Sequence, residues 1–198
     1  MVLELKIPAS VVELNFPNGL STEAFEELCF ANKELVVERE PDGKITVMSP
    51  VAPLSGDNEA DFVADLKIYA RKFGGKSYSS STGFTLPDDS VKSPDASYVS
   101  AERIAPYTKE QLRHFALLVP NFIVKVVSPS DELKDAKKKM TGVWMANGVS
   151  LGWLVDVETE RLWIYRQNGS VDLIEDFDRT ISGEDVLPDF EFDLRNLM

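Results

Sequence analysis

Apolar and polar positions along the chain switch several times between a helical and an alternating period, which predicts a series of helices and strands. Helical spacing marks residues 21–32, 55–73, 108–114, and a long stretch that begins near 128–135 and runs to Gly148. Ser21 or Thr22 is placed to cap the first helix. Gly74 and Gly75 follow the second and should end it.

Short runs with β-type composition fill much of the remaining sequence. They are residues 35–40 and 45–50, two strands within 83–100, and residues 122–128, 151–157 and 161–167. The first two runs flank Asp42 and Gly43, a pair typical of hairpin turns. The last two indicate a second hairpin, and the tail that contains residues 186–194 is expected to pack back on the body.

The order of these elements predicts an α/β fold with a mixed central sheet flanked by helices. The strand, helix and strand between residues 122 and 156 suggest a parallel crossover. The 198 residues suffice for one core of ordinary size, so we expect a single domain over residues 1–198. Hydrophobic content of 43% and charged content of 27% are normal for a globular protein.

Charge and rare residue types exclude several classes of function. A net charge of −12 weighs against a broad nucleic-acid-binding surface, because phosphate neutralisation needs lysine and arginine. Residues 134–139, KDAKKK, form the dense basic cluster, which is equally typical of a solvated helix face. With Cys29 and His114 as the single cysteine and histidine, an internal disulfide, a cysteine zinc cluster and a multi-histidine metal site are excluded.

Targeting features are not evident in the sequence. The apolar runs are too short to span a bilayer. The first ten residues, MVLELKIPAS, lack the basic start and apolar stretch of a signal peptide. We therefore expect a cytoplasmic protein without a membrane partner.

Lys125 interrupts the apolar run FIVKVVS, residues 122–128. Side chains alternate along a strand, and neither face of this run is polar, so Lys125 is not simply on the solvent side of an edge strand. Burying a charge is costly unless it is paired. Lys125 is therefore a snorkelling side chain at a strand end, one partner of an ion pair, or part of a site.

Four stretches carry a resemblance to a known family. They are SPDASYV at 93–99, FIVKVVSPSD at 122–131, KKKM at 137–140 and NGVSLGWLVD at 147–156. In this order and spacing the chain resembles the Uma-type family of putative restriction endonucleases, within the PD-(D/E)XK nuclease superfamily. The resemblance implies a restriction-endonuclease-like fold, Mg²⁺-dependent hydrolysis of DNA phosphodiesters, and, by analogy, a homodimer.

The resemblance also assigns site residues. Asp95 matches the PD aspartate and Glu38 an acidic residue of the first hairpin, and these two would hold the metal. Lys139 matches a displaced motif lysine that stabilises charge in the transition state. Ser128 matches a serine that follows the central strand. Lys125 stands where the family normally has its second metal-binding acid, a glutamate.

A lysine at that position should oppose metal binding. A protonated lysine cannot ligate Mg²⁺. Close to Asp95 it would attract the carboxylate and repel the cation, each effect being about 4 kcal/mol at 4 Å before desolvation. We therefore hypothesise that Lys125 pairs with Asp95 or Glu38 and that Mg²⁺ binding is weakened or lost. Glu59 and Asp61, on the predicted helix 55–73, match positions where family members can carry a polar residue facing the site.

Each site residue also has an ordinary structural interpretation. Asp95 could start a strand, Glu38 and Lys139 could be solvated, and the polar residues Ser128, Ser130 and Asp131 could cap a helix. Three functions stay open: a metal-dependent endonuclease with Asp95, Glu38, Lys125 and Lys139 at its centre; a catalytically degenerate nuclease fold that binds or regulates; and an interaction protein that never contacts nucleic acid.

Overall fold

The computed structural model describes residues 11–14, 16, 20–48, 50–128 and 132–197 of the chain. The chain groups into two compact units, each built from three segments. Unit 1 consists of Met1–Pro50, Gly83–Ser93 and Tyr107–Leu118, and unit 2 of Val51–Thr82, Pro94–Pro106 and Val119–Met198. The single domain expected for residues 1–198 stays a prediction, and each unit is described below by itself.

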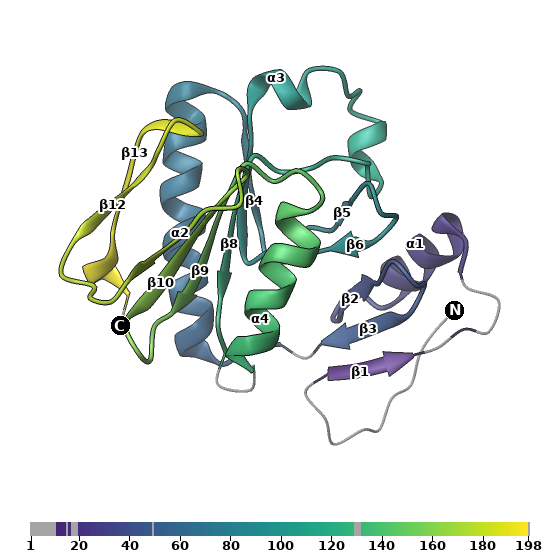
Figure 1. The fold of residues 1–198 in the computed structure, drawn as a ribbon. Helices are drawn as coiled ribbons and strands as arrows, with labels where there is room; N and C mark the ends of the chain where they lie inside the picture. Colours follow the sequence, from purple (N-terminus) through teal and green to yellow (C-terminus); the bar gives the residue numbers. More distant parts are fainter. Residues whose placement is uncertain (1–10, 15, 17–19, 49, 129–131, 198) are drawn as a thin grey trace. The chain divides into compact units, whose positions relative to one another are not determined.

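The described part of unit 1 is a five-stranded sheet with the α-helix α1 and a short 3₁₀ helix (Figure 1). The strand order is β1-β3-β2-β6-β5, with every neighbouring pair antiparallel. The elements are β1 (Val11–Leu14), α1 (Thr22–Ala31), β2 (Val36–Arg39), β3 (Ile45–Met48), β5 (Phe84–Thr85), β6 (Val91–Lys92) and the 3₁₀ helix η1 (Gln111–Arg113). Ser21 caps α1 by accepting a hydrogen bond from the Ala24 N–H. Gly43, at φ +83°, closes the predicted β2–β3 hairpin.

The two faces of this sheet differ in chemistry because successive side chains alternate along each strand. On one face the apolar residues of the strands pack with Phe25 and Leu28 of α1. Those residues are Val37, Ile45, Val47 and Val91. Arg39 pairs across the sheet with Ile45 and Val91, so it belongs to this apolar face. Glu38 lies opposite Thr46 on the other face.

Unit 2 contains a six-stranded mixed sheet of order β11-β10-β9-β8-β7-β4 (Figure 1). Its strands are β4 (Lys76–Ser79), β7 (Ala96–Val99), β8 (Phe122–Val126), β9 (Leu151–Asp156), β10 (Arg161–Arg166) and β11 (Val171–Ile174). Strands β8 and β9 are parallel, as the predicted crossover requires, and the other neighbours are antiparallel. The expected mixed sheet flanked by helices is therefore confirmed.

Helices pack against both faces of this sheet. On one face α2 (Pro53–Phe73) buries Phe62 and Leu66 against β-strand residues that include Val124 and Trp153. On the other face lies a helix in two parts, α4 (Leu133–Lys139) followed by the π-helical η2 (Met140–Met145). A Cβ at Gly152 would lie 2.7 Å from Met140 Cε, so this glycine permits the close approach of η2 to β9.

The tail packs on unit 2 as predicted. Strands β12 (Thr180–Gly183) and β13 (Leu187–Asp193) form a two-stranded sheet, followed by the 3₁₀ helix η3 (Leu194–Asn196). Phe192 is fully buried and stacks on Phe62 of α2 with ring centroids 4.2 Å apart. Phe190 contributes to the same core.

Several predictions of secondary structure are corrected. Residues 83–100 hold three strands in two different sheets, β5, β6 and β7, and not two strands around one turn. Strand β4 and the four-residue helix α3 (Ala101–Ile104) were not predicted. Helical spacing over residues 55–73 also predicts that Phe73 lies on the apolar stripe of this helix, but Phe73 is 43% exposed. Among the residues that the structure describes, no helix is long and apolar enough to cross a membrane.

Candidate functional site

Asp95 and Lys125 form an ion pair between neighbouring strands of unit 2. Strands β7 and β8 pair Ala96 with Val124, so the next step along both strands brings Asp95 opposite Lys125. The Lys125 ammonium donates to Asp95 Oδ1 at 2.6 Å, and the Val126 N–H donates to Asp95 Oδ2 at 2.6 Å. The Asp95 side chain is 11% exposed, whereas the Lys125 side chain is 32% exposed. The hypothesised pairing of Lys125 with Asp95 is thus present.

Glu59, on the second turn of α2, interacts electrostatically with this pair. Burial is the main cause that raises the pKa of the Glu59 carboxyl, and the charge of Asp95 raises it further. A hydrogen bond with Ser80 and the charge of Lys125 act in the opposite direction. Two carboxylates and one ammonium therefore influence one another in unit 2. Asp61, the other acid considered on this helix, has its pKa raised by burial and by Asp57.

Glu38 lies in unit 1, where a buried lysine holds it. Lys92 Nζ donates to Glu38 Oε2 at 3.2 Å, and the Ser93 N–H donates to Glu38 Oε1 at 2.9 Å. Lys92 also pairs with Glu40, which accepts a hydrogen bond from Thr46. Glu38 and Lys92 are 7% and 4% exposed. Glu38 is therefore a buried ion-pair partner and not a solvated strand residue.

The two acids predicted as metal ligands are held in the same way. Each carboxylate accepts one lysine ammonium on one oxygen and one backbone N–H on the other. Such charge-assisted hydrogen bonds fix the orientation of the carboxylate as well as its charge. The structure brings Asp95 together with Lys125, and Glu38 together with Lys92, in separate units.

The remaining candidates lie away from these contacts. Lys139 is exposed at the end of α4, and the Asp95 carboxylate accepts its hydrogen bonds from Lys125 and Val126. Ser128 follows β8, whereas Ser130 and Asp131 lie outside the described residues. His114 is at the surface, and its Nδ1 lies 2.9 Å from Glu26 Oε2.

Comparison with known proteins agrees with this fold. A family model described as "Putative restriction endonuclease" matches residues 22–195. The chain belongs to this Uma2 family. A crystal structure described as a putative nuclease belonging to DUF820, from Anabaena variabilis ATCC 29413, has 17% sequence identity and a TM-score of 0.66. The match covers 81% of this Uma2 chain and 88% of the other, and shows a shared fold. No curated protein sequence matches.

The Uma2 family implies a divalent metal, and the side chains of unit 2 fit one only in part. Among the described residues, no group of three or more His, Cys, Asp or Glu side chains could hold a metal ion. Mg²⁺ nevertheless often binds through one or two carboxylates, keeping water and substrate phosphate as its other ligands. A carboxylate offers about four acceptor sites. Asp95 uses two of them, so its carboxylate keeps acceptor sites for such an ion. Glu59 interacts with Asp95 electrostatically.

We expect Glu59→Gln to stabilise the protein at neutral pH. The pKa of Glu59 is raised in the folded state, so its ionisation opposes folding and stability falls as pH rises through that pKa. The gain should therefore be present at pH 7 and disappear in acid, where Glu59 is protonated. Thermal unfolding from pH 4 to pH 8 measures this.

Asp193→Asn is the matched control for that experiment. The pKa of Asp193 is lowered by its hydrogen bond to the Arg195 side chain, so its ionisation favours folding. Asp193→Asn should therefore destabilise the protein at neutral pH, whereas Glu59→Gln should stabilise it. A melting temperature of Glu59→Gln equal to wild type at every pH would contradict a raised pKa of Glu59.

Proposed function

We propose that this protein is a DNA endonuclease that hydrolyses phosphodiesters at Asp95, Glu59 and Lys125. The observation that carries the proposal is the ion pair of Asp95 with Lys125, whose two charges both act on Glu59, in unit 2 of a chain from a family described as putative restriction endonucleases. This proposal moves the second acid from Glu38 to Glu59, because the charges of Asp95 and Lys125 both act on Glu59.

Each side chain has a role that its contacts support. The Val126 N–H and Lys125 fix the orientation of Asp95, so its free acceptor sites keep one direction. Lys125 is partly exposed, so its ammonium can also contact a phosphate oxygen placed beside Asp95 and stabilise the charge that develops there. Asp95 and Glu59 would hold Mg²⁺, which when bound supplies polarisation of the phosphate and a more acidic water.

DNA is the proposed substrate, and α4 offers the basic surface for it. Lys134, Lys138 and Lys139 are exposed on this helix, and Lys137 lies 3.9 Å from the centre of the Trp163 ring. These lysines could neutralise phosphates locally although the whole chain is acidic. A homodimer and a cytoplasmic location, expected from the sequence, belong to the same proposal.

A catalytically degenerate nuclease fold is the second candidate. It is favoured by the short ion pair between Lys125 and Asp95, because Mg²⁺ at Asp95 must act against the lysine charge. In that case the protein would bind DNA, or another partner, without cleaving it.

Nicking of supercoiled plasmid in Mg²⁺ or Mn²⁺ tests the proposal. We expect metal-dependent nicking by the wild type and background nicking by Asp95→Asn, because the amide removes the charge that attracts the metal. Asp135→Asn, at an exposed acid of unit 2 paired with Lys138, is the matched control and should nick like wild type. Folded wild-type protein that nicks with neither metal, yet binds the plasmid in low salt, would favour the degenerate fold.

A further inference from the structure

Arg39 carries a positive charge that is buried in unit 1. The residue is 7% exposed and belongs to the apolar face of the unit 1 sheet. Its Nε donates to the carbonyl oxygen of Asp89 at 3.1 Å, and its guanidinium lies 5.3 Å from the centre of the Phe25 ring. Within the described part of the chain, no carboxylate forms an ion pair with Arg39. A buried charge in this state favours binding of an anion from outside.

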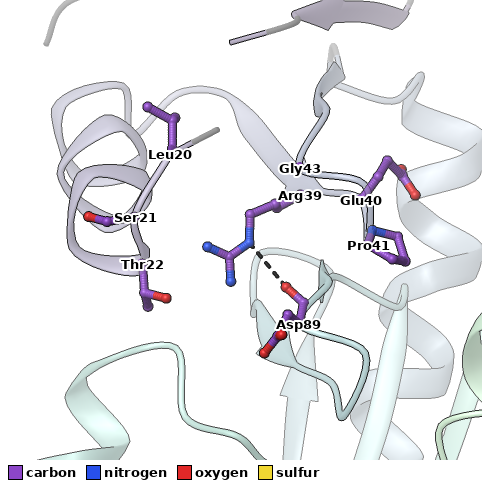
Figure 2. A pocket seen from close by; sticks show the side chains of 8 residues that line it. All are labelled: Leu20, Ser21, Thr22, Arg39, Glu40, Pro41, Gly43 and Asp89. Atoms are coloured by element: carbon purple, nitrogen blue, oxygen red, sulfur yellow. Dashed lines mark hydrogen bonds between the residues drawn. The ribbon is translucent and has the colours of Figure 1, made fainter. Parts of the chain in front are cut away.

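The free side of this guanidinium faces a cavity. The cavity has a volume of about 350 Å³ and is lined by residues that include Arg39, Ser21, Thr22 and Asp89. Figure 2 shows the guanidinium between Thr22, at the start of α1, and Asp89. The Asp89 carbonyl holds Nε, so the two Nη groups are left to donate to a ligand. A water molecule takes about 30 Å³, so the space admits a phosphate group with several waters.

The start of α1 adds to the attraction for an anion. The ten-residue helix begins at Thr22, and the first amide groups of a helix carry partial positive charge and lack partners within the helix. The Thr22 hydroxyl lines the same cavity. A rigid guanidinium beside a helix N-terminus matches the oxygens of a phosphate, because the planar fork can donate two parallel hydrogen bonds.

Two carboxylates that also line the cavity oppose an anion. Glu40 shares the Lys92 ammonium with Glu38, which offsets part of its charge. Asp89 is exposed, so water screens its carboxylate. The shielded charge in this cavity is therefore that of Arg39.

We infer that the cavity of unit 1 is an oxyanion site that takes a phosphate group on the Arg39 guanidinium beside the start of α1. The inference is independent of the proposed nuclease activity, because none of the residues involved belongs to unit 2. The phosphate could belong to a DNA backbone or to a small free phosphate compound, and the recognising chemistry is the same.

Titration with inorganic phosphate tests the site on the full chain. The Nε–H NMR signal of Arg39 is identified as the arginine signal that is missing from the spectrum of Arg39→Lys. We expect this signal to shift saturably when phosphate is added to the wild type. Arg39→Gln should bind phosphate at least about tenfold more weakly, since a hydrogen bond to a charged group contributes roughly 1.5–3 kcal/mol. The matched control is Arg113→Gln, which removes an exposed arginine of unit 1 and should bind like wild type.

The possible results show whether a phosphate site exists at Arg39 and which kind of molecule carries the phosphate. If Arg39→Gln does not fold, the wild-type Arg39 signal and Thr22→Val, which should weaken binding, still decide. A DNA duplex that shifts the same Arg39 signal and displaces phosphate would assign the site to the DNA backbone. A signal that responds to inorganic phosphate but not to the duplex would assign it to a small phosphate compound. No saturable shift in the wild type, or equal binding by Arg39→Gln and Arg113→Gln, would overturn the inference.

Discussion

Replacing Lys125 with glutamate should raise the affinity of the protein for Mg²⁺ by about a thousandfold or more. The Lys125 ammonium lies 2.6 Å from Asp95 Oδ1, so the substitution changes the charge beside that carboxylate by two units. Each elementary charge changes the interaction energy with the metal ion by about 4 kcal/mol at 4 Å and an effective dielectric constant near 20, before desolvation. Isothermal titration calorimetry with Mg²⁺ and Mn²⁺ measures the change.

Lys138→Glu controls for charge alone. This lysine is exposed in the same unit and pairs with Asp135, so the same reversal is screened by water. We expect its Mg²⁺ affinity to stay within about tenfold of wild type. Equal affinities for Lys125→Glu and the wild type would mean that Asp95 does not contribute to a metal site.

Lys92→Met should lower the free energy of unfolding by about 3–5 kcal/mol. The Lys92 side chain is 5% exposed and pairs with both Glu38 and Glu40. Removing it leaves the Glu38 carboxylate, which is 10% exposed, without a counter-charge. The Ser93 N–H remains as a partner, but a single hydrogen bond does not offset a buried charge. Urea denaturation measures the loss.

Two variants define what this loss means. Lys138→Met removes a lysine from an exposed pair and should cost less than about 1 kcal/mol. Adding Glu38→Gln to Lys92→Met should recover part of the stability, because the uncompensated charge is then removed. If Lys92→Met were no more destabilising than Lys138→Met, the buried pair would contribute little to the stability of unit 1.

The ion pair of Asp95 could be anticipated from the sequence, whereas that of Glu38 could not. Lys125 interrupts an apolar strand, so its charge requires a partner, and the resemblance indicated the acid. Lys92 gives no such signal, since it lies in a polar stretch, in a two-residue strand. Its contact with Glu38 joins residues 54 positions apart through the pairing of β2 with β6. The local pattern of apolar and polar residues does not predict this contact.

The roles of Glu59 and Arg39 also depend on contacts between distant elements, which local sequence patterns do not predict. A helical period identifies the stripe of α2 that packs on the sheet, but Glu59 gains its significance from Asp95, on a different element. Alternation along β2 places Arg39 on the face of Val37, and its neighbours Ile45 of β3 and Val91 of β6 show that this face is apolar at that point. The pairing with β6 could not be read from the sequence. Strand β4 was missed because its sequence, KSYS, lacks the apolar residues that mark a strand.

The interleaving of the two units affects how the chain can fold and be cut. Six segments alternate between the units, so the backbone passes from one to the other five times. During synthesis, unit 1 cannot be completed before Leu118 emerges, nor unit 2 before strand β13. Assembly thus depends on contacts between distant positions, which slows folding. No single proteolytic cut releases either unit whole, and both would have to be expressed, refolded and degraded together.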